Sequence, residues 1–162
     1  KGWTIAKRLL QHERQMISGI GGISALGGGR RNLEDIAKEY LGEENGRIAD
    51  SSMRNKIINH RMNDRSFQLA LSRSSQESQA GNANGNIASM SKYFGTEQNK
   101  RKYELLLQTM GTVSVGWEGT EFSDKELNTT RQWLRSKANS IEGGTSEVQL
   151  NVIAKRVLGL PD

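Results

Sequence analysis

The chain has 162 residues, which is enough for one domain with a buried core. It contains no cysteine and only two histidines, His12 and His60, which excludes disulfides and cysteine-rich metal sites, and we expect no metal site. Hydrophobic residues make up 34% of the chain, and because they recur periodically we expect a globular rather than a disordered protein. No apolar run approaches ~18 residues, so we expect no membrane span.

The net charge of +5 mildly favours an anionic partner. The clusters Arg30-Arg31 and Lys100-Arg101-Lys102 are more typical of solvated helix faces than of binding sites. The few aromatic residues do not interleave with these clusters, as stacking on a single nucleic-acid strand would require. A basic helical module that binds nucleic acid or an acidic protein is therefore kept only as an alternative, and we expect no nucleic-acid partner.

Apolar residues at spacings of three and four predict a first helix over roughly residues 2–26, ended by Gly27-Gly28-Gly29. Its inward stripe is expected to consist of Ala6, Leu9, Leu10, Met16, Ile17 and Ile20. A second helix is predicted to start with Asn32 as N-cap and to stop near Gly42. Residues 43–51 then read as a polar loop.

Three longer helices and a short one complete the predicted pattern. They cover roughly residues 50–80, Ile87 to Met110, the segment around Leu127 to Ala138, and residues 147–158. A turn is expected at residues 79–86, and a short extended piece within residues 111–122. The inward positions are expected to be Met53, Ile57, Ile58, Met62, Leu69, Leu71, Ile87, Met90, Phe94, Leu105, Leu106, Met110, Leu127, Trp133, Leu134, Ala138, Val148, Val152, Ile153 and Val157.

The only proline, Pro161, lies next to the last residue, and a proline-free interior favours long helices. No repeat and no internal boundary is visible. We therefore predict an all-α fold, an up-and-down helical bundle with extra short helices, formed as a single domain by residues 1–162. Because the chain opens directly as a helix without an initiator Met, we expect it to be a piece of a longer protein.

Glu13 is the first candidate for chemistry, because it is a carboxylate on the apolar stripe of the first helix. A Glu that faces a core must be paired, protonated or directed into a cavity. The pattern alone leaves two readings open. Either the stripe rotates and Glu13 pairs with a basic neighbour at the surface, or Glu13 is a base whose pKa is tuned by an apolar pocket.

The segment Glu142-Gly143-Gly144-Thr145-Ser146-Glu147 is the second candidate. Two glycines before a helix start expose backbone N–H groups at the positive end of a helix dipole, which suits a phosphate or a developing oxyanion. Ser146 followed by Gln149 has the pattern of a capping box, so we expect the last helix to start there. Glycine turns before capped helices are also common without any ligand, and both readings stay open.

Two segments, "GWTIAKRLLQHER" at the start and "ANSIEGGTSEVQLNVIAKRVLGLPD" at the end, resemble the two ends of the C-terminal helical domain of acyl-CoA dehydrogenases. The central "ASMSKYFGTEQNKRKYELLLQTMG" is similar to that domain's usual helix, with an Ala-Ser-x-x-Lys opening and a Gly close. The resemblance covers essentially the whole chain, firmly at both ends and more loosely between them.

The resemblance implies a flavoprotein of lipid metabolism with three domains, of which the N-terminal helical and middle β domains lie outside this chain. The implied reaction is α,β-dehydrogenation of an acyl-CoA thioester, in which a carboxylate removes the α proton and a hydride passes to the flavin. FAD is expected between domains and subunits of a homo-oligomer, or of a hetero-oligomer with a paralogous subunit. An electron-transfer flavoprotein is the expected acceptor. The expected location is the cytoplasm of a bacterium or the mitochondrial matrix of a eukaryote, and the piece alone is expected to be inactive.

The resemblance also assigns roles to single residues. Glu13 is the preferred base, because in one branch of the family the base on the first helix directly precedes an Arg, as in Glu13-Arg14. Glu142 is the second candidate, one position earlier than the base that directly precedes Gly-Thr-Ser in another branch. Arg14 matches the position that meets the CoA part of the substrate. The turn that contacts FAD in the family is matched by Gly144, Thr145, Ser146 and Glu147.

Two flavin motifs of the family are missing. "DSSMRNKI" stands where Arg-x-x-Phe-Gly is expected, and we do not assign that role to Arg54. "GTVSVGWEGTEF" replaces the Gly-Gly motif that normally reaches the FAD of a neighbouring subunit. The alternative function is therefore a non-catalytic subunit of the same fold, kept for assembly with an active partner.

Overall fold

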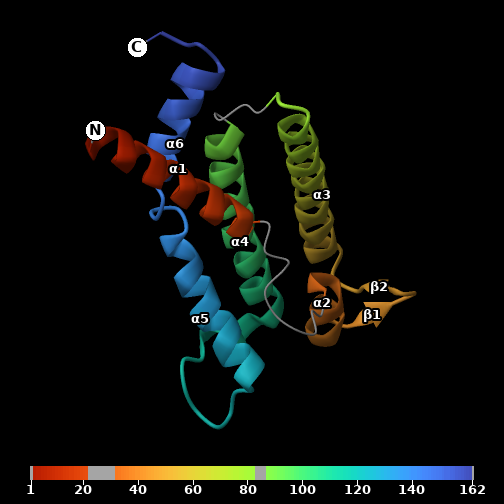
Figure 1. Cartoon of the computed structure of the whole chain (residues 1–162). Coiled ribbons are helices and arrows are strands. Elements are labelled where there is room, and N and C mark those ends of the chain that lie inside the picture. Colours follow the sequence, from red (N-terminus) through yellow and green to blue (C-terminus); the bar gives the residue numbers. More distant parts are fainter. Residues whose placement is uncertain (1, 22–31, 83–86, 162) are drawn as a thin grey trace. The chain divides into compact units, whose positions relative to one another are not determined.

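The computed structural model describes residues 2–21, 32–82 and 87–161; in α1 the side chains of residues 11 and 13–21 fall outside this description. Six α-helices make up most of the described chain (Figure 1). They are α1 (Gly2–Gly21), α2 (Leu33–Leu41), α3 (Ser51–Gln79), α4 (Ile87–Met110), α5 (Asp124–Ala138) and α6 (Ser146–Val152). The prediction of an all-α fold is confirmed. The predicted helix end at Gly27-Gly28-Gly29, the Arg30-Arg31 cluster and part of the turn at residues 79–86 lie outside the described residues.

The described residues form two compact units. Unit 1 contains residues 2–21, 65–82, 87–97 and 138–161, and unit 2 contains residues 32–64 and 98–137. In unit 2 the first half of α3, the second half of α4 and α5 run in alternating directions, and in unit 1 the other halves of α3 and α4 are antiparallel (Figure 1). This is the predicted up-and-down order. That the whole chain is a single domain of a three-domain protein stays a prediction.

Apolar side chains from α2, α3 and α4 form the core of unit 2. The buried members are Leu33, Ala37, Ile48, Met53, Ile57, Leu105 and Leu106, and Ile36, Leu41 and Tyr103 pack against them. Met53 and Ile57 lie one turn apart on α3, so helical periodicity turns both to the same side. Ile57 is only 1% exposed, and burial of such a side chain contributes about 1.5–3 kcal/mol.

The second helix begins as the sequence predicts. Asn32 is its N-cap, with φ −62° and ψ 147°, and its N–H donates to Asp35 Oδ2 at 3.3 Å. Glu34 and Asp35 both lie in the first turn, where negative charge complements the helix dipole. Gly42 ends the helix with φ 83°, in the left-handed region that favours glycine.

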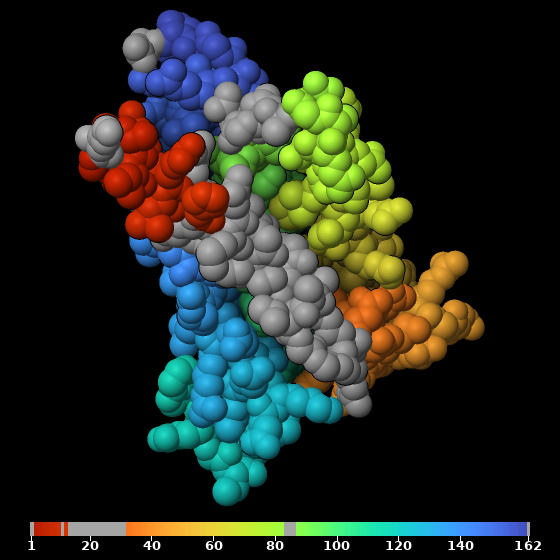
Figure 2. All heavy atoms as spheres, viewed as in Figure 1, coloured from red at the N-terminus to blue at the C-terminus, as the bar shows by residue number. Residues whose placement is uncertain are grey.

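The prediction of a plain loop at residues 43–51 is wrong, because these residues contain a β-hairpin. Strand β1 (Glu43–Glu44) pairs antiparallel with β2 (Arg47–Ile48). Asn45 and Gly46 join the strands with φ values of 51° and 77°, which Asn-Gly adopts readily in two-residue hairpin turns. The hairpin projects from the helices of unit 2 (Figure 2), while the Ile48 side chain reaches back into the core.

The extended piece expected within residues 111–122 is also wrong. Gly111–Val115 form a 3₁₀ turn directly after α4, and bends and turns without a strand follow up to α5. Ser114 Oγ donates to the Gly111 carbonyl at 2.6 Å, and the buried Thr130 hydroxyl of α5 donates to the Ser114 carbonyl at 2.8 Å. These bonds hold the turn against α5.

Several side chains expected to face inward are exposed. They are Leu9, Leu10, Ile58, Met62, Leu69, Met90, Leu134 and Val148. In the first half of α4 the buried positions are instead polar: Ser89, Ser91, Lys92 and Thr96. Apolar periodicity cannot find such a face, because polar residues at helical spacing look like a solvated surface.

Candidate functional site

The segment between α5 and α6 is a tight turn that its two glycines make possible. Gly143 and Gly144 have φ values of 67° and 96°, a region that other residues rarely adopt. The N–H groups of Ile141 and Glu142 both donate to the Ala138 carbonyl at 2.9 Å, which closes the C-terminal end of α5. The Ser146 N–H donates to the Ser140 carbonyl at 3.0 Å and closes the turn itself.

Thr145 caps α6. It has extended backbone angles, φ −60° and ψ 161°, and its Oγ1 accepts from the Val148 N–H at 3.3 Å. The predicted helix start at Ser146 is confirmed, but the predicted capping pair of Ser146 and Gln149 is wrong. Ser146 is already helical, and only the extended residue before it can turn its side chain back to the first N–H groups.

Glu97 of α4 holds both ends of the turn. Its Oε1 accepts from Ser140 Oγ and from Ser146 Oγ, each at 3.2 Å. A carboxylate that accepts from hydroxyls on both sides of a turn fixes the width of that turn. Ser146, predicted as a flavin contact, therefore directs its hydroxyl towards α4.

Two fully buried polar side chains lie against the glycines. Lys92 is 0% exposed, and its Nζ donates to the Gly144 carbonyl at 2.8 Å. Gln149, also 0% exposed, donates from Nε2 to the Gly143 carbonyl at 2.9 Å and to the Gly144 carbonyl at 3.5 Å. Lysine is almost never fully buried without a specific partner. Sequence reasoning assigned no role to Lys92, although the Ala-Ser-x-x-Lys pattern contained it, and it missed that Gln149 is buried.

Glu142, the second candidate base, is half-buried at the start of the turn. Its Oε1 accepts from Nδ2 of Asn139, a residue that is 7% exposed. The carboxylate is thus fixed by a neighbour three residues away. Glu147 is exposed on the first turn of α6, two positions after the cap.

Glu13 and Arg14 lie within the helical backbone of α1, as predicted, but their side chains are outside the described residues. The roles of Glu13 as base and of Arg14 as a substrate contact therefore stay predictions. On the described part of α1 the large apolar side chains face solvent: Trp3 is 71%, Ile5 68% and Leu9 68% exposed.

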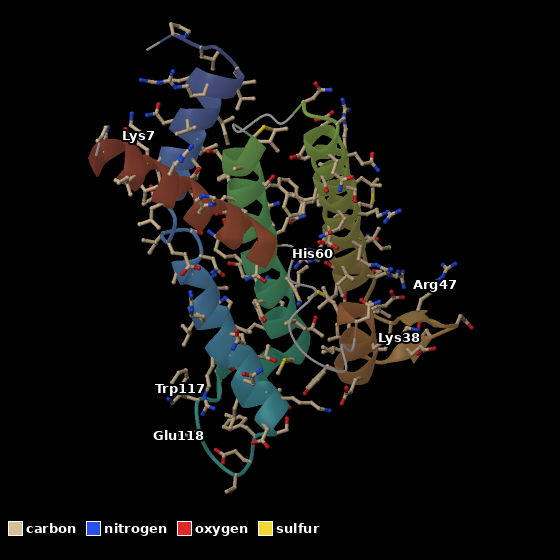
Figure 3. All side chains as sticks on the ribbon, viewed as in Figure 1. Lys7, Lys38, Arg47, His60, Trp117 and Glu118 are labelled. Carbon is tan, nitrogen blue, oxygen red and sulfur yellow. The ribbon has the colours of Figure 1, made fainter. Side chains whose placement is uncertain are left out.

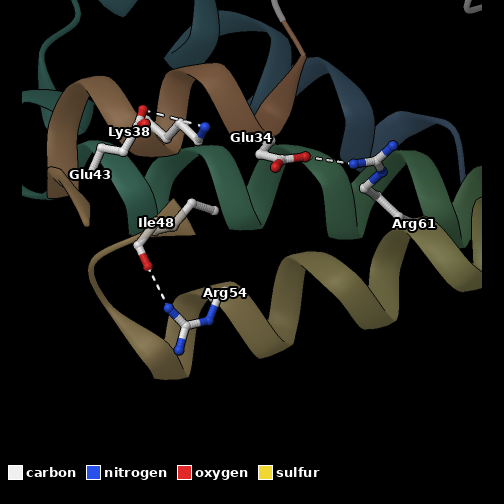
Figure 4. Close-up of polar contacts among 6 residues, drawn as sticks. All are labelled: Glu34, Lys38, Glu43, Ile48, Arg54 and Arg61. Atoms are coloured by element: carbon white, nitrogen blue, oxygen red, sulfur yellow. Dashed lines mark hydrogen bonds and ion pairs between the residues drawn. The ribbon is translucent and has the colours of Figure 1, made fainter. Parts of the chain in front are cut away.

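Arg54, which stands near the missing Arg-x-x-Phe-Gly motif, contributes to the fold of unit 2. Its Nη1 donates to the Ile48 carbonyl at 2.7 Å and ties the hairpin to α3 (Figure 4). Two ion pairs lie nearby in the same unit: Lys38 Nζ is 3.3 Å from Glu43 Oε2, and Arg61 Nη1 is 2.5 Å from Glu34 Oε2.

The segment that replaces the Gly-Gly motif is folded against α5. The Arg131 guanidinium lies 5.3 Å from the centre of the Trp117 ring and donates to the Trp117 carbonyl at 2.9 Å. At Gly116 an added Cβ would lie 2.7 Å from the Phe122 ring, so Phe122 packs directly on this backbone. Trp117 and Glu118 lie on the outward loop before α5 (Figure 3).

His60 of α3 lines a pocket of about 310 Å³ in unit 2, together with Gln98 and Arg101 of α4. Burial lowers the pKa of His60 below 6.5; Asp64 opposes this shift, while Lys102 and Arg101 add to it. Neither amide atom of Gln98 has a hydrogen-bond partner in the described chain.

Two classes of feature are not found in the described residues. Among the described side chains of residues 2–21, 32–82 and 87–161, no group of three or more His, Asp or Glu could hold a metal ion. Within the same ranges, no helix is long and apolar enough to cross a bilayer.

Comparison with known proteins places these features in a family. The family model "Acyl-CoA dehydrogenase, C-terminal domain" matches residues 1–158. Acyl-CoA dehydrogenase IpdE1 of Mycolicibacterium smegmatis is 28% identical over 166 aligned positions, which cover 99% of this chain and 37% of that protein. IpdE1 of Mycobacterium tuberculosis is also 28% identical, over 99% of this chain and 38% of that protein. The chain thus spans well under half the length of these relatives.

Solved structures share the fold. A protein described as the Tcur3481-Tcur3483 steroid ACAD matches with a TM-score of 0.75 and 20% identity, over 99% of this chain and 40% of that one. The ChsE4-ChsE5 complex from Mycobacterium tuberculosis matches with a TM-score of 0.63 and 21% identity, over 80% of this chain and 34% of that one. With the family model covering nearly every residue, the chain belongs to the acyl-CoA dehydrogenase family and corresponds to its C-terminal domain.

Proposed function

We propose that the chain is the C-terminal part of an FAD-dependent acyl-CoA dehydrogenase that carries out α,β-dehydrogenation of an acyl-CoA thioester. The match of the family's C-terminal domain to residues 1–158 carries this proposal. The proposal assigns the base to Glu13 on α1, with Glu142 as the second candidate. A carboxylate on a helix is held in a fixed position relative to the proton that it removes.

The proposal places the flavin nucleotide at the turn before α6. An added Cβ at Gly144 would lie 2.6 Å from Gln149 Nε2, so the backbone there is packed as closely as only glycine allows. Gly144, Thr145, Ser146 and Glu147 would hold FAD, and FAD, when bound, supplies the acceptor for the hydride. Arg14 would pair with the phosphates of the CoA moiety, because a guanidinium binds phosphate through two parallel hydrogen bonds.

Substitution of the two carboxylates in the full-length protein tests the base assignment. Glu13→Gln should lower kcat for acyl-CoA oxidation by about 10²–10⁴-fold, the usual contribution of a general base, while FAD stays bound. Glu142→Gln is the matched control and should keep most of the activity. Full activity in Glu13→Gln would contradict the assignment, and loss in Glu142→Gln alone would transfer the role to Glu142.

We further propose that the protein assembles with a paralogous subunit and passes its electrons to an electron-transfer flavoprotein. Both solved relatives are described by the names of two proteins together, which supports a hetero-oligomer over a homo-oligomer. The two curated relatives are bacterial, which supports a cytoplasmic location. Because one relative is described as a steroid ACAD, acyl-CoAs with a steroid side chain belong among the substrates to test.

A non-catalytic subunit of the same fold is the second candidate function. Arg54 and the loop at residues 111–122 stand where the family's flavin motifs are expected, and both make bonds within their own fold. A non-catalytic subunit would be colourless when the full-length protein is purified alone and would gain flavin only on co-expression with its paralogue. A yellow protein that oxidises an acyl-CoA unaided would exclude this candidate.

A further inference from the structure

The turn at Gly143 and Gly144, the proposed flavin contact, is held by two fully buried side chains, Lys92 and Gln149. Their side-chain nitrogens donate to the carbonyls of two successive glycines, Gln149 to Gly143 and Lys92 to Gly144. Ordering a buried lysine costs side-chain entropy and hydration, so a bond from Lys92 to a surface turn indicates that the position of that turn matters.

The bonds to the two carbonyls determine where the neighbouring N–H groups point. In a trans peptide unit the C=O and the following N–H point in opposite directions. The Gly143 carbonyl is held by Gln149, so the Gly144 N–H points away from the buried amide. The Gly144 carbonyl is held by Lys92, so the Thr145 N–H points away from the buried ammonium group.

The two N–H groups form a pair of donors with no acceptor in the described chain. Among the groups that the structure describes, neither the Gly144 N–H nor the Thr145 N–H has an acceptor, although Gly144 and Thr145 are only half-exposed. On the carbonyl side of the same peptide units, Gln149 Oε1 is buried and also has no hydrogen-bond partner in the described chain. The amide of Gln149 is therefore held in place through its donor side alone.

We propose that Lys92 and Gln149 are positioning residues, which hold the carbonyls of Gly144 and Gly143 inward and so present the N–H groups of Thr145 and Gly144 to an acceptor oxygen of bound FAD. This inference rests on the proposed function, because it takes the turn to be the flavin contact. Neither Lys92 nor Gln149 touches FAD in this account. Glu97 assists by fixing the width of the same turn through Ser140 and Ser146.

The test compares Lys92 with a second lysine, Lys137, which also donates a short hydrogen bond. Lys92→Met and Lys137→Met are made in the full-length protein, co-expressed with its paralogous subunit if it needs one. Lys137 is the control: its Nζ donates to Glu104 Oε1 at 2.6 Å in unit 2. FAD is removed, and each apoprotein is titrated with FAD while its melting temperature and its flavin absorption band are recorded. Lys92→Met is expected to weaken FAD binding at least tenfold, because the Gly144 carbonyl loses its charged donor, and Lys137→Met less than about twofold.

A second variant keeps the test decisive if Lys92→Met does not fold. Gly144→Ala leaves Lys92 in place, but its Cβ would lie 2.6 Å from Gln149 Nε2, and φ at this position is 96°, which alanine rarely adopts. The substitution should therefore rotate the same two peptide units. It should reproduce the loss of FAD affinity. A shifted flavin band would mark an oxygen of the flavin ring as the acceptor, and loss of affinity with an unshifted band would mark a phosphate oxygen; both support the proposal.

The outcomes separate the inference from the function on which it rests. If the wild-type protein binds FAD, and Lys92→Met and Gly144→Ala bind it as tightly as Lys137→Met does, the positioning role is overturned while the proposed function stands. If the wild-type protein binds no FAD with or without its paralogue, the proposed function fails, and the inference with it.

Discussion

Two neighbouring isoleucines on α3 allow the contribution of the unit 2 core to stability to be measured, because the same Ile→Ala substitution can be made at a buried and at an exposed position. Ile57 is 1% exposed and belongs to the apolar cluster, whereas Ile58 is 48% exposed. Truncation to Ala removes three carbon atoms, which corresponds to roughly 2.4 kcal/mol of lost transfer free energy for a fully buried side chain. The cavity left at a buried site raises the cost to about 3–4 kcal/mol. Ile58→Ala should lose only about half of this transfer free energy and leave no cavity, so its expected cost is roughly 1 kcal/mol.

Urea unfolding of the 162-residue chain, followed by far-UV circular dichroism, measures this difference. Ile57→Ala should be less stable than Ile58→Ala by about 2 kcal/mol or more, which shifts the midpoint by about 1 M if the slope is near 2 kcal/mol per M. Both substitutions carry the same change in helix propensity, so that effect cancels in the comparison. Equal midpoints, or a less stable Ile58→Ala, would refute the assignment of this core.

Further predictions concern the cap of α6 and the half-buried His60. Thr145→Ala should lower the stability by about 1 kcal/mol, because it removes the acceptor for the Val148 N–H, and Ser146→Ala should cost less. Thermal unfolding of both variants measures the difference. A larger loss for Ser146→Ala would identify Ser146, not Thr145, as the N-cap of α6. Burial lowers the His60 pKa below 6.5, so the stability that neutral His60 contributes is complete above about pH 6.5 and is lost as the pH falls from 6.5 through the folded-state pKa. Urea midpoints between about pH 5 and 7 should therefore fall less steeply with acidification in His60→Gln than in the wild type, and identical slopes would contradict the assignment.

The helices were predictable because apolar spacing and glycine positions are local signals. The predicted ends of α3 and α4 agree with Ser51–Gln79 and Ile87–Met110 to within a residue, and Asn32 caps α2 as expected. The hairpin was missed although Asn45-Gly46 is a strong turn signal, because each strand has only two residues and shows no alternation.

The structure around the candidate site was less predictable, because it depends on contacts between residues distant in the sequence. The two glycines before α6 indicated a tight turn. No local pattern indicated that Lys92, about fifty residues earlier, would donate a hydrogen bond to Gly144. Ser146 and Gln149 matched a capping pattern, yet tertiary contacts to Glu97 and to the glycine carbonyls use both side chains instead. Glu13 and Arg14 stay predictions that rest on the resemblance of the first helix.

A visible absorption spectrum would show whether this chain is part of a flavin-dependent acyl-CoA dehydrogenase, as we propose. The full-length protein, purified with any subunit that accompanies it, is scanned in the visible range before and after addition of straight-chain, branched and steroid side-chain acyl-CoAs. We expect a flavin spectrum that one of these acyl-CoAs bleaches. A colourless preparation, or a yellow one that none of them bleaches, would contradict the claim.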